Sequence, residues 1–186
     1  MYPNLEPHGL IMKINRQPLP ELSDEVVKQD RDYWVKYVAP MIGDWLHTDA
    51  TVKEITAFAE KVYVKKDLSE FKGDPQFVQS EYSCRMFSKL RSSIGGLYAW
   101  RGQHATDADE KRHMDDEADF AFRQAFALCP YSPEAVFRYV NLLLSEGRTA
   151  DALLVAETAE KMTQLDGEQI RNLITQLKQY QNQQQN

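Results

Sequence analysis

Apolar residues recur along most of the chain with the three- and four-residue spacing of helices that bury one face. From Ser23 onward this spacing repeats in successive segments, which are separated by turns rich in Gly, Pro and Asp. The pattern predicts an all-α fold of antiparallel helix pairs. We expect helices at about 24–46, 52–63, 75–101, 114–128, 133–146, 149–163 and 167–180.

Several predicted helices begin with recognisable capping residues. Ser23 precedes the acidic pair that opens the first helix, and Asp74 precedes Pro75 at the third. Thr51 and Glu54 have the spacing of a capping box. Pro40 falls inside the first helical pattern, so we expect a kink or a break there.

The two ends of the chain differ from the helical middle. Residues 1–22 hold four of the eight prolines and an apolar strip at 10–14, which predicts an extended N-terminal arm with a short strand or a strip lying against the helices. The chain from Gln179 is almost all Gln and Asn, and we expect it to fray into a polar tail at 181–186.

Charge excludes some partners. The chain carries a net charge of −6, and the stretch 106–119 supplies seven acids against two bases. No basic face suits a phosphate backbone, so we expect no nucleic-acid partner. No apolar run reaches the roughly 18 residues of a membrane helix, so the chain itself is not expected to span a membrane. Cys84 and Cys129 sit in apolar segments and are expected to be small buried residues.

The second half of the chain contains a repeat. Between 133 and 164, bulky residues such as Val136 and Tyr139 are followed by Gly147 and then by the small residues Ala152 and Ala159. This order resembles a tetratricopeptide repeat, in which small residues let two helices cross closely. The preceding segment matches at Ala118, Phe122, Ala125 and Pro130 for the second helix and at Ile94, Gly95, Tyr98 and Gly102 for the first.

The first of these two repeats is eleven residues longer than the pattern, and the excess falls in the acidic stretch. The resemblance implies a TPR-like α-solenoid, and an ordinary helical bundle with alanines at its crossings is the alternative. We expect the following organisation: arm 1–22, N-terminal helices 23–87, repeat 1 at 88–131 with an acidic insertion at 103–117, repeat 2 at 133–164, a capping helix at 167–180 and the tail. Two repeats and a cap are few for an array, so we expect one core shared with the N-terminal helices.

A second resemblance concerns residues 2–11 and 126–133, Tyr-Pro-Asn-Leu-Glu-Pro-His-Gly-Leu-Ile and Phe-Ala-Leu-Cys-Pro-Tyr-Ser-Pro. They look like parts of the C-terminal soluble region of a bacterial membrane-protein family similar to protein O-mannosyltransferases. The resemblance implies an excised tail on the outer side of the cytoplasmic membrane. Without it, a cytoplasmic location is expected.

In the tetratricopeptide family, fixed first-helix positions line a concave groove. Bases and amides there could hold a peptide carboxylate and its backbone. The alternative is that these residues are merely solvated, or are covered by the arm or by another copy in a homo-oligomer. The resemblance places the groove at Lys89, Ser92, Ser93, Phe137, Arg138, Asn141, Arg171, Asn172 and Thr175.

Motifs for catalysis were sought and not found: the sequence has no Gly-rich phosphate loop, nucleophile elbow or His-Glu-x-x-His. His104 and His113, with Asp109 or Glu117, are the only candidates for a metal site, in what we expect to be a solvated acidic loop. We therefore expect a non-catalytic scaffold that binds a protein or peptide, with no cofactor and no metal. The alternatives are a purely structural or oligomerisation domain, or a metal-binding or enzymatic domain built on the acidic insertion.

Overall fold

The computed structural model describes residues 1–162 and 167–184. It confirms the prediction of a mainly helical fold. The 3₁₀ turn η1 (Tyr2–Asn4) and the π-helical turn η2 (Glu60–Val64) are short. The α-helices are α1 (Asp24–Ile42), α2 (Val52–Ala59), α3 (Pro75–Gln79), α4 (Glu81–His104), α5 (Ala108–Leu128), α6 (Pro133–Ser145), α7 (Thr149–Glu160) and α8 (Gly167–Gln184).

The N-terminal arm contains a β-hairpin. Strand β1 (Leu5–His8) pairs antiparallel with β2 (Ile11–Ile14), with Pro7 opposite Met12. Gly9, at φ +63°, takes the first central position of the two-residue turn, which only glycine occupies without strain. The strand foreseen near 10–14 therefore exists, and its partner is the proline-containing segment before it.

Local capping explains where most helices begin. The side chains of Ser23, Thr51 and Asp74 each accept a backbone N–H in the first turn, and Thr51 forms the full capping box with Glu54. The single helix predicted at 75–101 is wrong in one respect. It is divided at Ser80, whose extended backbone ends α3 and whose side chain caps α4.

The acidic stretch is helical. Asp107 caps α5, which begins at Ala108. Most of the acidic insertion expected at 103–117 therefore lengthens the antiparallel pair α4 and α5. The expectation of an acidic loop is therefore wrong. Since these residues already have helical spacing, Asp107 at the N-cap and acids in the first turn are enough to start the helix there.

Two other boundaries differ from expectation. Helix α1 continues through Pro40 and ends at Ile42, before Gly43 at φ +95°. The tail does not fray at 181, because α8 continues to Gln184. Residues 163–164 of the predicted repeat 2 and residues 185–186 of the tail lie outside the described residues.

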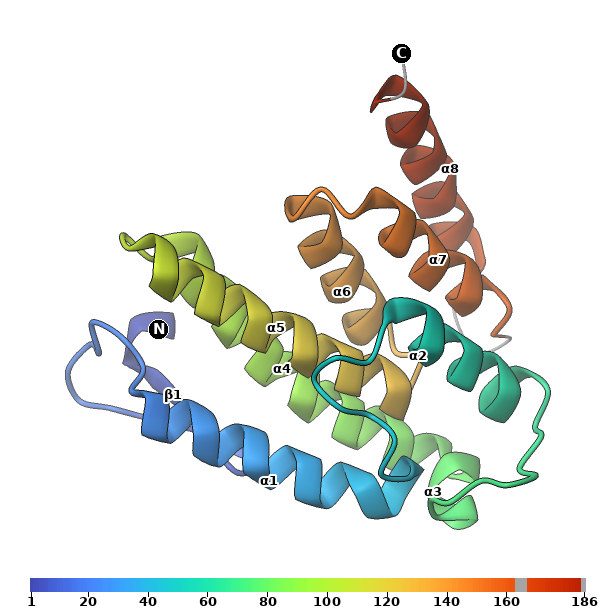
Figure 1. The fold of residues 1–186 in the computed structure, drawn as a ribbon, viewed down its shortest axis with the longest axis horizontal. Helices are drawn as coiled ribbons and strands as arrows, with labels where there is room; N and C mark the ends of the chain where they lie inside the picture. Colours follow the sequence, from blue (N-terminus) through green and yellow to red (C-terminus); the bar gives the residue numbers. More distant parts are fainter. Residues whose placement is uncertain (163–166, 185–186) are drawn as a thin grey trace.

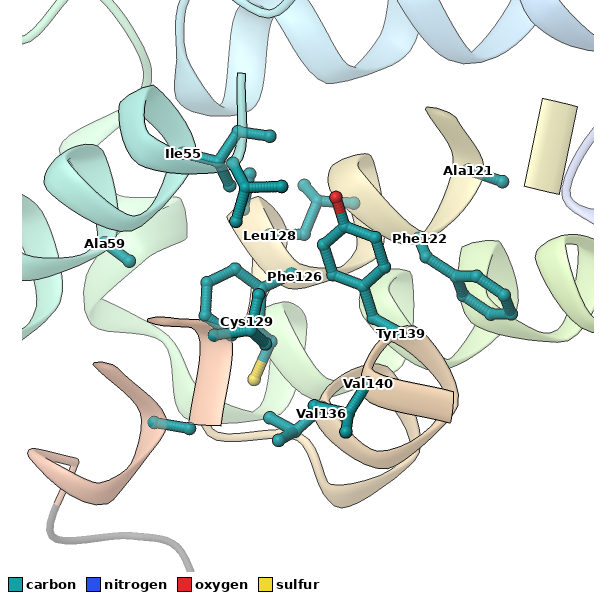
Figure 2. Close-up of a cluster of buried hydrophobic side chains, with 14 of the residues drawn as sticks. Ile55, Ala59, Ala121, Phe122, Phe126, Leu128, Cys129, Val136, Tyr139 and Val140 are labelled. Atoms are coloured by element: carbon teal, nitrogen blue, oxygen red, sulfur yellow. The ribbon is translucent and has the colours of Figure 1, made fainter. Parts of the chain in front are cut away.

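Consecutive helices from α4 to α8 each pack on the next, while α1 lies along α5 and α2 lies against α5 and α7 (Figure 1). The arm contacts α1 through β1, and α4 through both β1 and β2. Buried apolar residues from Leu22 to Leu177 form one cluster, and Figure 2 shows the part where α2, α5 and α6 meet. The N-terminal helices α1 and α2 thus cover one side of the C-terminal pairs, and the side where α4 meets α6 carries the candidate site.

Candidate functional site

A hollow of about 220 Å³ lies between α4 and α6. Its apolar part comes from Ala99, Phe122 and Leu142, of which the Phe122 and Leu142 side chains belong to the buried core. Its polar part comes from side chains on both helices, namely Gln103, Arg138 and Asn141. An apolar floor with a few polar groups at the edge is the usual composition of a recognition site.

Gly96 lets the arginine of α6 reach across to α4. A Cβ atom at Gly96 would lie 3.1 Å from the Nη1 atom of Arg138. That nitrogen donates a hydrogen bond to the carbonyl oxygen of Ser92, at 3.1 Å. The missing side chain of Gly96 therefore makes room for the guanidinium at the hollow.

Electrostatics at this interface favour an anion. Lys89 lies 3.7 Å from the carboxylate of Glu134. The pKa of Glu134 is lowered, first by the backbone N–H of Glu134 itself and further by the positive charges of Lys89 and Arg138. Within residues 1–162 and 167–184 no carboxylate forms a salt bridge with Arg138, so its guanidinium can pair with a ligand carboxylate although its charge also acts on Glu134.

The predicted groove residues on α4 and α6 divide into two groups. Arg138 and Asn141 line the hollow, whereas Phe137 does not. Ser92 is fully buried and donates a hydrogen bond to the carbonyl oxygen of Glu134, at 3.2 Å. The prediction that Ser92 is open to a ligand is therefore wrong, because this small side chain joins the two helices. Ser93 donates to the carbonyl oxygen of Lys89, one turn earlier on the same helix.

The predicted residues on α8 do not line this hollow. Arg171, Asn172 and Thr175 are exposed, and the Thr175 hydroxyl donates to the carbonyl oxygen of Arg171 within its own helix. The α8 residues that lie near Leu144 of α6 are mostly apolar instead. A separate hollow of about 270 Å³ there is lined by Leu144, Leu173, Gln176, Leu177 and Tyr180.

The arm reaches one end of the α4–α6 hollow. The ring of Tyr2 lines the hollow and stacks on Trp100, with ring centroids 5.5 Å apart. Arg101 fixes this position, because its guanidinium donates to the carbonyl oxygens of Leu19 at 2.8 Å and Pro3 at 3.0 Å. The idea that the arm covers the groove thus holds for one end of it.

A buried polar cluster behind α4 was missed by sequence reasoning. Arg91 is fully buried and donates to Asp30 of α1 and to Gln124 of α5, each at 2.7 Å. The hydroxyl of Tyr98 also donates to Asp30, at 2.9 Å, and burial raises the pKa of this tyrosine. The guanidinium of Arg91 lies over the ring of Trp34. The cluster fixes α4, one wall of the hollow, against two other helices.

A signal for this cluster was present in the sequence. Arg91, Ile94 and Tyr98 have the spacing of one helix face, and so do Val27, Asp30 and Trp34. Charged residues on two apolar faces indicate a buried pair, since an isolated charge is rarely buried.

The two histidines near the acidic stretch, His104 and His113, lie on different helices. His104, at the end of α4, stacks on Trp100. His113, on α5, lies 3.9 Å from both Asp24 and Glu117. No group of three or more His, Cys, Asp or Glu side chains that could hold a metal occurs among the residues described. The metal-binding alternative therefore gains no support.

Comparisons with protein-family models, with curated proteins and with solved structures found no significant match. Within the described part of the chain, no helix has both the length and the hydropathy needed to cross a bilayer.

Proposed function

We propose that the chain is a non-catalytic, tetratricopeptide-like interaction scaffold that binds an extended, acidic peptide segment in the hollow between α4 and α6. The observation that carries the proposal is the position of Arg138 over Gly96. The guanidinium of Arg138 lies there beside the apolar residues of the hollow, and it forms no salt bridge with a carboxylate of the described chain. Peptide affinity in such grooves comes from backbone and carboxylate contacts made by side chains of this kind.

The proposed site is smaller than the one expected from sequence. It keeps Arg138 and Asn141 as direct contacts, whereas Lys89 lies outside the hollow and is paired with Glu134. A tether to a membrane-bound glycosyltransferase-like parent is part of the proposal, and it rests only on the resemblance at residues 2–11 and 126–133.

The test is selection from a random linear peptide library on the full chain, followed by affinity measurement. We expect enrichment of acidic peptides whose Kd rises at least tenfold in Arg138→Glu. Arg171→Glu is the matched control, because it makes the same charge change on an exposed residue that does not line the hollow. Selected peptides that bind both variants equally, or no enrichment at all, would refute the proposal.

A structural role is the second candidate, and the apolar hollow between α6 and α8 favours it. Tyr180 is 46% exposed beside Leu173 and Leu177, a composition suited to contact with another copy of the chain. Light scattering of the wild type and of Tyr180→Glu decides this reading. A dimer that the substitution dissociates supports it, and a monomer at micromolar concentration contradicts it.

A further inference from the structure

A third hollow, of about 250 Å³, lies where the end of α1 meets η2 and the loop at 65–74. Its lining is mostly apolar and includes three aromatic rings. Trp45 packs against Phe58 with centroids 4.6 Å apart, and Phe58 against Phe71 at 6.3 Å. The indole N–H of Trp45 donates to the carbonyl oxygen of Ile42, at 3.0 Å, which fixes the orientation of the ring.

The backbone around this hollow is unusual. The turn η2, which supplies Lys61 and Val62, is π-helical. In the adjoining loop, Lys66 and Glu70 adopt positive φ angles of 53° and 60°. Such strained conformations gather at ligand sites, and π-helical turns are also frequent there.

Specific contacts hold that loop in place. The backbone N–H of Asp74 donates to the carbonyl oxygen of Met41, at 3.1 Å, and that of Asp67 to Lys61, at 2.9 Å. Gly73 permits the close approach, because a Cβ atom there would lie 2.5 Å from the same Met41 oxygen. The hollow is therefore formed by a fixed backbone, as a preformed binding site requires.

Charge at the hollow indicates which head group fits. Of the charged residues that line it, Lys61 is half-buried, whereas Asp44, Asp67, Glu70 and Lys72 are exposed. Asp67 already accepts a hydrogen bond from the backbone N–H of Ser69. Within the described ranges Lys61 forms no salt bridge, although its charge helps to lower the pKa of Asp67, after the hydrogen bonds from Ser69. A ligand carboxylate beside its ammonium group would be stabilised.

We propose that this hollow binds a small aromatic carboxylate, with its ring against Trp45, Phe58 and Phe71 and its carboxylate at Lys61. The size limits the ligand, because pockets for larger organic ligands usually enclose about 300–1,000 Å³. A single-ring acid fits the space, and a nucleotide does not. The hollow shares no lining residue with the one between α4 and α6, so this inference stands independently of the peptide site.

Phenylacetate is the probe, and the ¹H–¹⁵N spectrum of the full chain is the measurement. The three tryptophans give three indole signals, and Trp45→Phe identifies the one of interest. We expect phenylacetate to shift that signal in a saturable way. Phenethylamine and benzyl alcohol, which keep the ring and replace the charge, are expected to bind at least fivefold more weakly.

Lys61→Gln is expected to weaken phenylacetate binding at least fivefold, while Lys65→Gln, which changes an exposed residue outside the lining, leaves the affinity unchanged. Absence of a saturable shift with phenylacetate overturns the proposal. Tighter binding of phenethylamine than of phenylacetate also overturns it, and this outcome requires no variant to fold.

Discussion

The C-terminal helix pairs and the N-terminal segments are attached to the common core by different kinds of contact. The pairs from α4 to α7 cross at small side chains, with Ala121, Ala125, Ala152 and Ala156 fully buried. The N-terminal segments add buried polar contacts to their apolar ones. Asp30 of α1 binds Arg91, the arm binds Arg101, and the hydroxyl of Tyr63 donates to the carbonyl oxygens of Ala127 and Leu128.

The difference shows which contacts can be predicted from the hydrophobic pattern of the sequence and which cannot. Alanine crossings follow from spacing along one helix, because the same residues that set the period also make the contact. A buried polar contact depends on a partner far away in the sequence. Here Asp30 and Arg91 are 61 positions apart.

The largest test of this comparison removes one partner of the buried pair. Arg91→Met leaves the Asp30 carboxylate buried without its cation, which we expect to lower the free energy of unfolding by about 3–5 kcal/mol. The double variant Asp30→Leu, Arg91→Met should recover most of that loss. Urea unfolding followed by circular dichroism measures both, and a single variant within ~1 kcal/mol of the wild type would contradict the assignment.

Substitution of two neighbouring glycines, Gly95 and Gly96, tests how closely the helices cross. A Cβ atom at Gly95 would lie 2.9 Å from the buried ring of Phe122, whereas one at Gly96 would meet only the end of the Arg138 side chain. We expect Gly95→Ala to destabilise through overpacking by about 1–3 kcal/mol, less the helical preference for alanine. Gly96→Ala should be neutral or stabilising. Equal thermal midpoints for the two variants would be inconsistent with the close crossing.

The attachment of the arm is tested at Arg101. Arg101→Gln removes charged hydrogen bonds to carbonyl oxygens, so the arm should open locally while the helices stay folded. Amide exchange at Asn15 and Leu19, whose N–H groups bond to the arm's own backbone, should rise about tenfold, equivalent to ~1.4 kcal/mol. Amides in α6 serve as the internal control, and uniform acceleration across the chain would indicate global destabilisation instead.

The smallest expected effect is that of pH on the capping box of α2. Hydrogen bonds from Thr51 lower the pKa of Glu54 below its ordinary value of 4.5. The stabilisation is therefore present above pH 4.5 and is lost as the pH falls through the lower pKa of the folded state. Compared with Glu54→Gln, the wild type should have the higher urea midpoint at pH 6, and the advantage should disappear at low pH. A pH-independent difference would assign the effect to another contact.

Much of the helical order could be predicted from the sequence, because capping residues and apolar spacing are local signals. Helix α6 was expected at 133–146 and spans Pro133–Ser145. Ser80 was missed since its effect depends on the backbone angles it adopts, and the acidic stretch was misjudged because composition suggested a loop where Asp107 starts a helix. Of the predicted site residues, Arg138 and Asn141 line the hollow between α4 and α6, and their role in binding stays a prediction. The predicted residues of α8 do not line it, because spacing within a helix does not determine how that helix is rotated against its neighbours.

Arg101 holds the arm through main-chain oxygen atoms alone, at Pro3, Leu5, Leu19 and Pro20. Every residue type offers the same carbonyl group, so this contact places no demand on the side chains of the arm. Sequence divergence at Pro20 is then limited by the course of the chain and not by residue identity, whereas Leu19 and Leu22 also pack with the core. Related proteins could differ at the arm positions that do not pack with the core and still keep the same attachment, provided that an arginine remains at position 101.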